Sequence, residues 1–504
     1  MKKFNILFLI PIIFTLEVFA STLNLSISSS PSRLNPILAN DSASSEIANW
    51  LFNGLFKYDK DGNVTTDLAS NYEFITKTKL QITLKQNVLW HDKREVTAKD
   101  VLFTYEKIMD PKVFNSIKSN FKLVNSVKIL DKYKIEVNYK EPYFKALEIW
   151  MVGLLPEHIL KDEENLMTSS FNKKPIGTGS YKIDSFEVGK DIELYANEDY
   201  FDGKPKIKKI LYKFLPDPNT SFLFLKQEKL DVGGLTPIQI DRQITNDFKD
   251  KYQIIEKPSF SYTYMGFNLK NEKFKDLRVR QALSLAINRE ELVEILFFGH
   301  GEICNGPFLP RTYAFDESVQ TPKQNIQKAK TLLKELGYDE NNPFTFEVVT
   351  NTGNDIRINA AQILQYQLAR AGIDMNIRVM EWQAFLNTVV HPRNFEAVIL
   401  GWGLGLTPDA YSIWHSSNSK LGGFNFVSYN NKKVDELIEK GAITVDKKEL
   451  AKIYKELYRI ISADLPYLFL YIPNSISTVH KKIKNLEPAF TGFMHNQKDW
   501  EIKN

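Results

Sequence analysis

Cysteine is almost absent from this sequence of 504 residues, which contains only Cys304. A single cysteine forms no internal disulfide, and it does not supply the several thiolates of a Cys-based zinc site. We therefore expect Cys304 to be a small, buried, apolar residue. The fold must be stabilised by hydrophobic cores, for which an apolar content of 43% is sufficient.

A large excess of one charge is also lacking. The sequence has 65 Lys and Arg against 61 Asp and Glu, which gives a formal net charge of +4. Proteins that bind nucleic acids usually carry a basic face or stripe. The one cluster of lysines, KPKIKKI at 204–210, is interrupted by Pro and Ile and is typical of a solvated strand. The charge balance therefore argues against a nucleic-acid partner.

The common catalytic motifs are missing. There is no G-x-S-x-G elbow, no H-E-x-x-H and no Walker A loop. The stretch GWGLGL at 401–406 fails the dinucleotide pattern G-x-G-x-x-G because its sixth residue is Leu406. We expect a protein without catalytic residues or a catalytic cofactor, and a secreted enzyme is the remote alternative.

Long hydrophobic runs are confined to the N-terminus. Lys2 and Lys3 precede an apolar run that ends in small residues at Ala20, which predicts a secretory signal peptide over 1–20, cleaved after Ala20. The run is short for a bilayer span. The next residue, Ser21, is not the cysteine of a bacterial lipid anchor. We expect an exported monomer, in the periplasm of a Gram-negative cell.

The remaining sequence alternates between strand and helix patterns. In the second half, FTFEVVTN at 344–351 is followed by a helical pattern over 359–373 and by two further strands, 374–382 and 395–402. This order is the signature of an α/β fold. Ligands bind beyond the carboxyl ends of the strands in such sheets, so the strand that ends at Trp402 points to a cleft.

Five further stretches form a set in a fixed order along the chain. They are LFNGLFKYDKDGNVTTDLASNYEF at 51–74, LKQNVLWHDKREVTAKDVLFTYEKI at 84–108, PIGTGSYKIDSFEVGKDIELYANEDYFDGKPKIKKI at 175–210, MGFNLKNEKFKDLRVRQALSLAINREEL at 265–292 and NFVSYNNKKVDELIEKG at 425–441. Together they resemble the peptide/nickel class, family 5, of extracytoplasmic solute-binding proteins that serve ABC importers.

The resemblance implies two α/β lobes joined by two crossing strands, with an extra domain inserted in the first lobe. Lobe I would combine 21–60, 175–262 and 478–504, the inserted domain would be 61–174, and lobe II would be 263–477. A small ligand would bind between the lobes and favour their closed arrangement, which an inner-membrane permease then recognises.

The resemblance leaves two kinds of cargo open. Peptide binders of the family place an Asp three residues after the Trp of "G-W", where it pairs with the amino terminus of the peptide. That position is Gly405 here, although Asp409 lies four residues further on. This difference weakens the interpretation as a di- or oligopeptide-binding protein and leaves it as the alternative.

The sequence interpretation favours a nickel chelate such as nickel-histidine. The nickel branch commonly adds one protein His to a small organic chelator, and imidazole suits Ni(II). His480 is the first metal candidate, because Ile476, Thr478 and His480 share one face of a strand expected to lie beside the cleft. His415 is the second candidate.

Aromatic and basic residues near expected strand ends complete the candidate site. Tyr264, Trp382 and Trp402 would give rigid contact surfaces for a ligand. Arg357, near a helix start, and Arg33, in SRLNP, would each pair with a ligand carboxylate.

Overall fold

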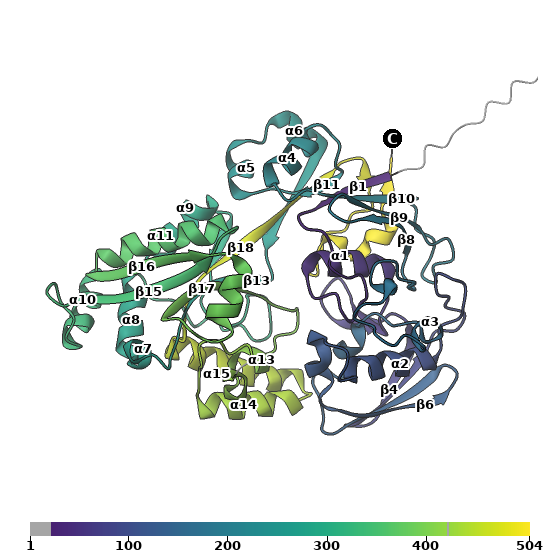
Figure 1. Ribbon diagram of the computed structural model, residues 1–504, viewed down its shortest axis with the longest axis horizontal. Coiled ribbons are helices and arrows are strands. Elements are labelled where there is room, and N and C mark those ends of the chain that lie inside the picture. Colours follow the sequence, from purple (N-terminus) through teal and green to yellow (C-terminus); the bar gives the residue numbers. More distant parts are fainter. Residues whose placement is uncertain (1–21, 421–422, 504) are drawn as a thin grey trace, which may run out of the picture.

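A computed structural model describes residues 22–420 and 423–503, so the predicted signal peptide lies outside the described residues. Twelve of the described strands form one long sheet (Figure 1). Its main path runs β16 (Ile373–Met380), β15 (Phe344–Asn351), β17 (Ala397–Gly403), β13 (Ser261–Phe267), β18 (Tyr467–His480), β11 (Val232–Gly234), β1 (Thr22–Ile27), β10 (Lys209–Phe214), β9 (Asp191–Ala196) and β8 (Tyr181–Glu187), while β12 (Tyr252–Pro258) and β14 (Gly301–Ile303) pair with β18.

Strand β18 joins the two halves of this sheet. Its first half pairs with β13 and β14, and its second half pairs with β12 and β11. The change of partners falls between Pro473 and Asn474. A second crossing leads from the end of β12 at Pro258 into the start of β13 at Ser261. The protein is therefore a two-lobed α/β fold with two crossing strands, as the sequence predicted.

Lobe II is a three-layered unit around strands β13 to β17. Strand β15 pairs in parallel with both β16 and β17. Successive residues of β17 pack into opposite clusters, Val398 with one and Ile399 with the other. One cluster contains α8 (Leu277–Ala286), α9 (Arg289–Phe297), α10 (Ile326–Glu335) and α11 (Asp355–Ala369), and the other contains α13 (Tyr411–Trp414), α14 (Lys432–Ile443) and α15 (Lys447–Asp464). Burial on both faces explains why the strand reads AVIL without alternation.

The other half of the molecule combines lobe I with a smaller sheet. The smaller sheet has the order β4 (Ala69–Thr76), β5 (Lys79–Leu84), β7 (Lys134–Tyr139) and β6 (Val124–Asp131), and it lies with α2 (Ala98–Met109) and α3 (Glu157–Leu160). Its buried residues belong to the same hydrophobic cluster as those of β1 and α1 (Ser42–Leu51). A separate small cluster holds α4 (Pro218–Lys226) and α6 (Asn246–Lys251) against β12, and α5 (Pro237–Arg242) lies beside them (Figure 1).

The turn at Gly177, Thr178 and Gly179 locks α1 in place. A Cβ added to Gly177 would lie 1.8 Å from the carbonyl oxygen of Leu51, at the end of α1. The ring of His91 holds the turn from the other side, because Gly177 N–H donates to Nδ1 over 3.1 Å and Nε2 lies 3.1 Å from Gly179 O. Neither glycine has a positive φ, so a left-handed backbone is not the reason for glycine at these positions. The reason is the close approach of the two backbone segments, which leaves no room for a Cβ.

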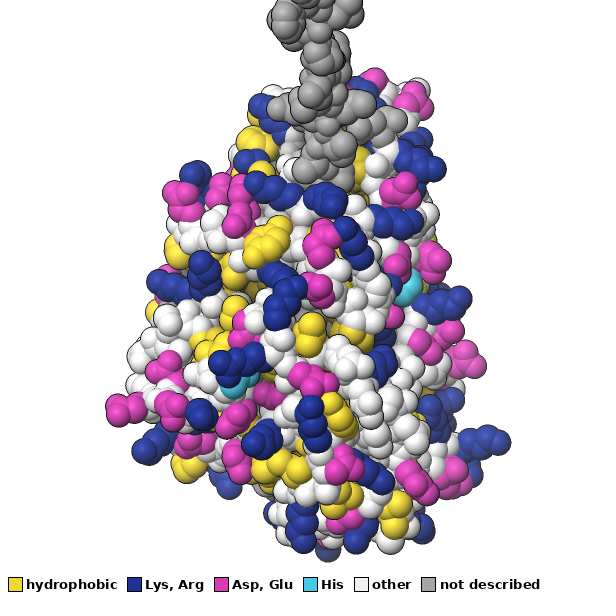
Figure 2. All heavy atoms as spheres, turned by 90° about the vertical axis from the view of Figure 1, so that its right-hand side faces the viewer, with side chains coloured by type: hydrophobic (Ala, Val, Ile, Leu, Met, Phe, Trp, Pro, Cys, Tyr) yellow, Lys and Arg dark blue, Asp and Glu magenta, His cyan; other side chains and the backbone are white. Residues whose placement is uncertain are grey.

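The surface mixes charges of both signs. In the face shown in Figure 2, Lys and Arg side chains alternate with Asp and Glu, and neither sign forms a continuous patch. Cys304 is 1% exposed, as its sequence context predicts. Within residues 22–420 and 423–503, none of the helices combines the length and the apolar character needed to span a bilayer.

Candidate ligand-binding cleft

A cavity of about 950 Å³ is lined mostly by residues of lobe I. One stripe of α1 lines it through Ser42, Ser45, Glu46 and Asn49, which have the i, i+3, i+4, i+7 spacing of one helix face. Lobe II reaches the cavity with Leu406, from the loop after β17. A cavity of this volume between two lobes is a normal size for a small-ligand site.

A second cavity of about 280 Å³ lies under the loop after β17. Trp402, Gly405 and Asp409 all line it, so the structure brings these three predicted residues together. Lys145, from the segment that follows β7, lines it from the opposite side of the cleft. The sequence predicted from strand order that this loop lies beside a cleft, and in the structure the loop lines this cavity.

The carboxylate of Asp409 is already paired. Oδ2 accepts a hydrogen bond from Lys145 Nζ over 2.8 Å, and Oδ1 accepts one from Tyr411 N over 3.0 Å. Burial raises the pKa of Asp409, but Lys145 and the Tyr411 N–H outweigh burial and hold it below its ordinary value. The negative charge is therefore compensated by this chain's own Lys145 and is not available to a ligand amine in this arrangement.

Trp402 and Tyr264 belong to one aromatic stack. The Trp402 ring lies parallel to Phe426 at 5.5 Å and to Tyr264 at 6.3 Å, and its Nε1 donates to the hydroxyl of Tyr467 over 3.3 Å. Trp402 is half-buried and lines the smaller cavity. Tyr264 is 1% exposed and stacks on Tyr467 at 3.8 Å. Its ring is therefore a buried packing partner of Trp402 and not a surface for a ligand.

Arg357 lies where the parallel strands of lobe II end. Its Nη1 donates to Asn351, the last residue of β15, over 3.1 Å. A Cβ added to Gly401 would lie 3.0 Å from Nη2, so the guanidinium lies against the end of β17. Burial lowers the pKa of Arg357, and Nε has no hydrogen-bond partner among the described residues. No carboxylate of the described residues pairs with this half-buried cation.

Trp382 belongs to lobe II and Arg33 to lobe I, and neither residue lines the two cavities. Trp382 begins α12 (Trp382–Phe385) directly after β16 and is 38% exposed, with its ring 6.2 Å from Phe385. Arg33 is half-buried in the loop between β1 and α1, where its backbone N–H donates to Ser44 Oγ over 3.3 Å.

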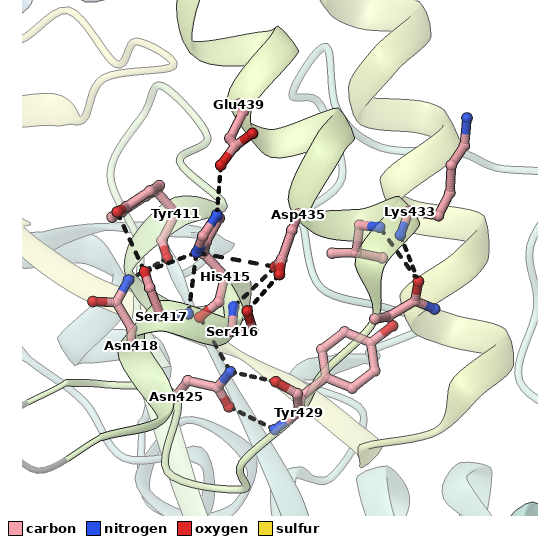
Figure 3. Close-up of polar contacts among 12 residues, drawn as sticks. Tyr411, His415, Ser416, Ser417, Asn418, Asn425, Tyr429, Lys433, Asp435 and Glu439 are labelled. Atoms are coloured by element: carbon pink, nitrogen blue, oxygen red, sulfur yellow. Dashed lines mark hydrogen bonds and ion pairs between the residues drawn. The ribbon is translucent and has the colours of Figure 1, made fainter.

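His415 is enclosed by its own loop and by α14 (Figure 3). It is 8% exposed, and its ring stacks on Tyr411 at 4.7 Å. Nδ1 lies 2.8 Å from Ser417 Oγ, and Nε2 lies 3.3 Å from Glu439 Oε1. Both ring nitrogens therefore have partners inside lobe II.

His480 differs from its expected position. The sequence placed the face of Ile476, Thr478 and His480 beside the cleft, whereas Ser477, which points to the opposite face of β18, lines the large cavity. Ile476 packs in the cluster of α4 and α6 instead. His480 Nδ1 accepts from Lys482 N over 3.1 Å and Nε2 lies 3.4 Å from Glu228 Oε2. In the described part of the chain, no three His, Cys, Asp or Glu side chains form a group able to hold a metal ion.

Sequence reasoning missed the lining of lobe I. The stripe of α1 and the end of β18 at Ser477 form much of the large cavity, together with Gly233 and Gly234 of β11. A signal for the stripe exists in SASSEIANWL, where polar side chains recur at helical spacing opposite Ile47 and Leu51. The same pattern is typical of any surface helix, so only the tertiary structure shows that this face borders a cavity.

A two-lobed α/β fold with a ligand-sized cavity at the lobe boundary is the architecture of solute-binding proteins. The family model for "Bacterial extracellular solute-binding proteins, family 5 Middle" matches residues 63–424, and the chain belongs to this family. It is a binding protein and not an enzyme.

Relatives of the chain include both peptide and nickel binders. The oligopeptide-binding protein AppA of Bacillus subtilis is 32% identical over 93% of this chain and 89% of its own. Its structure in complex with a nonapeptide covers 96% of this chain and 99% of its own, with a TM-score of 0.84 and 30% identity. NikZ from Campylobacter jejuni in complex with Ni(L-His) matches with the same coverage and TM-score at 29% identity. The nickel-binding protein NikA of Staphylococcus aureus is 26% identical over 86% of this chain and 85% of its own.

Proposed function

We propose that this protein is the periplasmic substrate-binding subunit of an ABC importer and that it captures short peptides between its two lobes for delivery to an inner-membrane permease. The observation that carries the choice of cargo is the 32% identity with oligopeptide-binding AppA over 93% of the chain. This similarity supports the peptide alternative more than the nickel chelate that the sequence interpretation favoured.

The geometry of the cleft is consistent with a peptide. The large cavity offers about 950 Å³, and α1 contributes the hydroxyls of Ser42 and Ser45 and the amide of Asn49 to one wall. Polar groups of this kind satisfy the N–H and C=O groups of a bound backbone. His415 and His480, the two metal candidates, instead have both ring nitrogens next to protein partners.

Arg357 is the proposed partner of a ligand carboxylate in lobe II. It is a half-buried cation at the carboxyl ends of β15 and β17, and no carboxylate of the described residues compensates it. A guanidinium at such a position binds a carboxylate through two parallel hydrogen bonds. Trp402, beside the same strand end, would give such a ligand a flat apolar contact.

A nickel chelate is the second candidate, because NikZ in complex with Ni(L-His) has a TM-score of 0.84 to this chain. Isothermal titration calorimetry separates the two candidates. The protein, freed of carried ligand by unfolding and refolding, is titrated with a pool of random tetrapeptides and, separately, with Ni(II) plus L-histidine. We expect heat only from the peptides. Heat only from the nickel mixture would overturn the peptide proposal.

Export to the periplasm can be tested by the mass of the mature protein. Intact mass of the protein isolated from the periplasmic fraction should correspond to a chain that begins at Ser21. Recovery of the full-length mass in the cytoplasmic fraction would contradict the predicted signal peptide.

A further inference from the structure

Glu46 is the single charged side chain on the α1 stripe that lines the large cavity. Its neighbours on the stripe, Ser42, Ser45 and Asn49, are neutral and polar. The opposite side of α1 is buried in the core of lobe I through Ile47, Trp50 and Leu51. Glu46 is thus held by a well-packed helix and is exposed to the cavity.

Two buried aromatic residues position the Glu46 carboxylate. It accepts a hydrogen bond from the Tyr212 hydroxyl, and this hydroxyl in turn accepts a hydrogen bond from Trp50 Nε1 over 2.9 Å. Tyr212 and Trp50 are 0% and 1% exposed. The surrounding protein partly shields the Glu46 carboxylate from water, and this loss of solvation raises its pKa. The hydrogen bond from Tyr212 opposes the shift. A chain of hydrogen bonds anchored in the core fixes the carboxylate in one place.

The other charges of the cavity wall are compensated within the protein. Asp67 is 3% exposed and lies 3.3 Å from Lys57 Nζ. Lys498 lies 2.8 Å from Asp499 and 3.7 Å from Asp202. No Lys, Arg or His of the described residues lies within ion-pairing distance of Glu46.

A carboxylate that faces a cavity and has no cation beside it favours a ligand that carries a positive group. When the lobes close, water leaves the cavity, and the ionised carboxylate loses solvation unless a positive group replaces it. On the opposite wall, the smaller cavity has Gly405 and the already paired Asp409. Glu46 is therefore the acid of the cleft that lacks a partner for its charge.

We propose that Glu46 binds the α-ammonium group of the peptide cargo. An ammonium donates three hydrogen bonds, and the carboxylate of Glu46 together with the neighbouring Ser45 hydroxyl and Asn49 amide oxygen offers acceptors on one helix face. The inference rests on the proposed function, because it assigns the end of the peptide that lobe I holds.

The test compares free and blocked amino termini. Wild type, Glu46→Gln and the control Glu187→Gln are titrated with a random tetrapeptide pool and with the same pool after N-acetylation. Glu187 lies on β8, is 61% exposed and pairs with Lys190 outside the cavity. In wild type and in the control, acetylation should weaken binding by tenfold or more. In Glu46→Gln, the free pool should bind at least tenfold more weakly, and acetylation should cost less than twofold further.

Several results would overturn the inference. An equal loss on acetylation in wild type and in Glu46→Gln would show that the amine is bound elsewhere. Binding of an N-acetylated lysine peptide that depends on Glu46 would assign the site to a side-chain ammonium. If wild type binds no peptide of either pool, the proposed function fails and the inference fails with it. Far-UV circular dichroism and the thermal midpoint of Glu46→Gln should match wild type, because Gln keeps the hydrogen bond from Tyr212.

Discussion

His91 shows how strongly the surroundings decide the role of one residue type. His91, His415 and His480 are all little exposed, but only His91 has its two ring nitrogens bound to backbone groups of the same turn, Gly177 N–H and Gly179 O. Because Nδ1 accepts a hydrogen bond there, the ring must be neutral with its proton on Nε2. The ring therefore holds Gly177 and Gly179, the two ends of the turn, together.

The neutral state of His91 predicts a pH-dependent stability. Burial lowers its pKa from 6.5 to about 4. Between these values the unfolded chain binds a proton that the folded chain does not, so the free energy of unfolding falls as the pH falls from 6.5 toward 4. The contribution is complete above pH 6.5 and amounts to about 3 kcal/mol.

Urea unfolding of wild type and His91→Gln at pH 7 and at pH 4.5 measures this contribution. The loss of stability between the two pH values should be smaller in His91→Gln, because Gln does not titrate. His391→Gln, in the turn before β17, is the matched control and should lose as much as wild type. An equal loss in all three proteins would contradict the assigned protonation state.

Arg357 gives a second prediction at the scale of one residue. If it binds the carboxylate of a peptide, Arg357→Gln should weaken binding of a free-acid tetrapeptide pool by roughly tenfold, about 1.4 kcal/mol. C-terminal amidation of the pool should then cost little further. The control is Arg278→Gln, because Arg278 is exposed and already pairs with Asp276 over 2.7 Å. Equal affinity of wild type and Arg357→Gln for the free-acid pool would remove Arg357 from the site.

At the scale of elements, Asp100 joins two helices. One carboxylate oxygen accepts from Thr97 N over 2.8 Å at the start of α2, and the other accepts from Glu157 N over 3.0 Å at the start of α3. Thr97 and Asp100 form a capping box at the start of α2, and this pattern is local in the sequence. The contact with α3, 57 positions further along the chain, depends on the tertiary fold.

Removal of the Asp100 side chain should therefore affect both helices. In Asp100→Ala, two N–H groups lose their acceptor, and we expect a loss of about 2–4 kcal/mol in the free energy of unfolding. Asp100→Asn keeps one oxygen acceptor and should lose less. The midpoint of urea unfolding followed by circular dichroism gives the comparison. A loss in Asp100→Asn as large as that in Asp100→Ala would contradict the shared role.

Strand β18 shows what the pattern of a single strand does not determine. Its extended form and its role as a crossing were predictable, but the cavity lies against Ser477 and not against the face of Ile476, Thr478 and His480. A shift of one residue exchanges the two faces of a strand. Which face turns to the cavity depends on the packing of α4 and α6 on lobe I, and the strand itself carries no sign of this packing.

At the scale of the whole molecule, contacts between the two sides of the cleft hold the lobes together. Lys145 pairs with Asp409, the Tyr58 hydroxyl lies 3.1 Å from Thr407 Oγ1, and Phe144 N donates to Ala442 O over 3.2 Å. Lys122 Nζ lies 3.2 Å from the centre of the Tyr411 ring. Separation of the lobes would break these contacts, so they favour the arrangement that the structure describes.

Lys145→Ala should shift the balance toward an open molecule. The Lys145 side chain is 14% exposed, and without it Asp409, which is 33% exposed, keeps a partly buried charge that separation of the lobes would solvate further. We expect a larger radius of gyration by small-angle X-ray scattering and an affinity for the tetrapeptide pool that is several-fold lower. Lys190→Ala breaks an exposed pair with Glu187 and should change neither quantity. An unchanged radius of gyration in Lys145→Ala would contradict a role of this pair in closure.

The sequence by itself determined the family and the α/β class with its two crossing strands, and it singled out the loop of Trp402, Gly405 and Asp409 as a candidate part of the cleft. These features depend on local patterns and on motifs that lie in one order along the chain. The tertiary structure decided which charges are free: Asp409 is paired with Lys145, 264 positions away, whereas Glu46 and Arg357 have no ionic partner among the described residues. Pairing between distant residues depends on how the lobes pack, and for that reason the sequence alone did not point to Glu46.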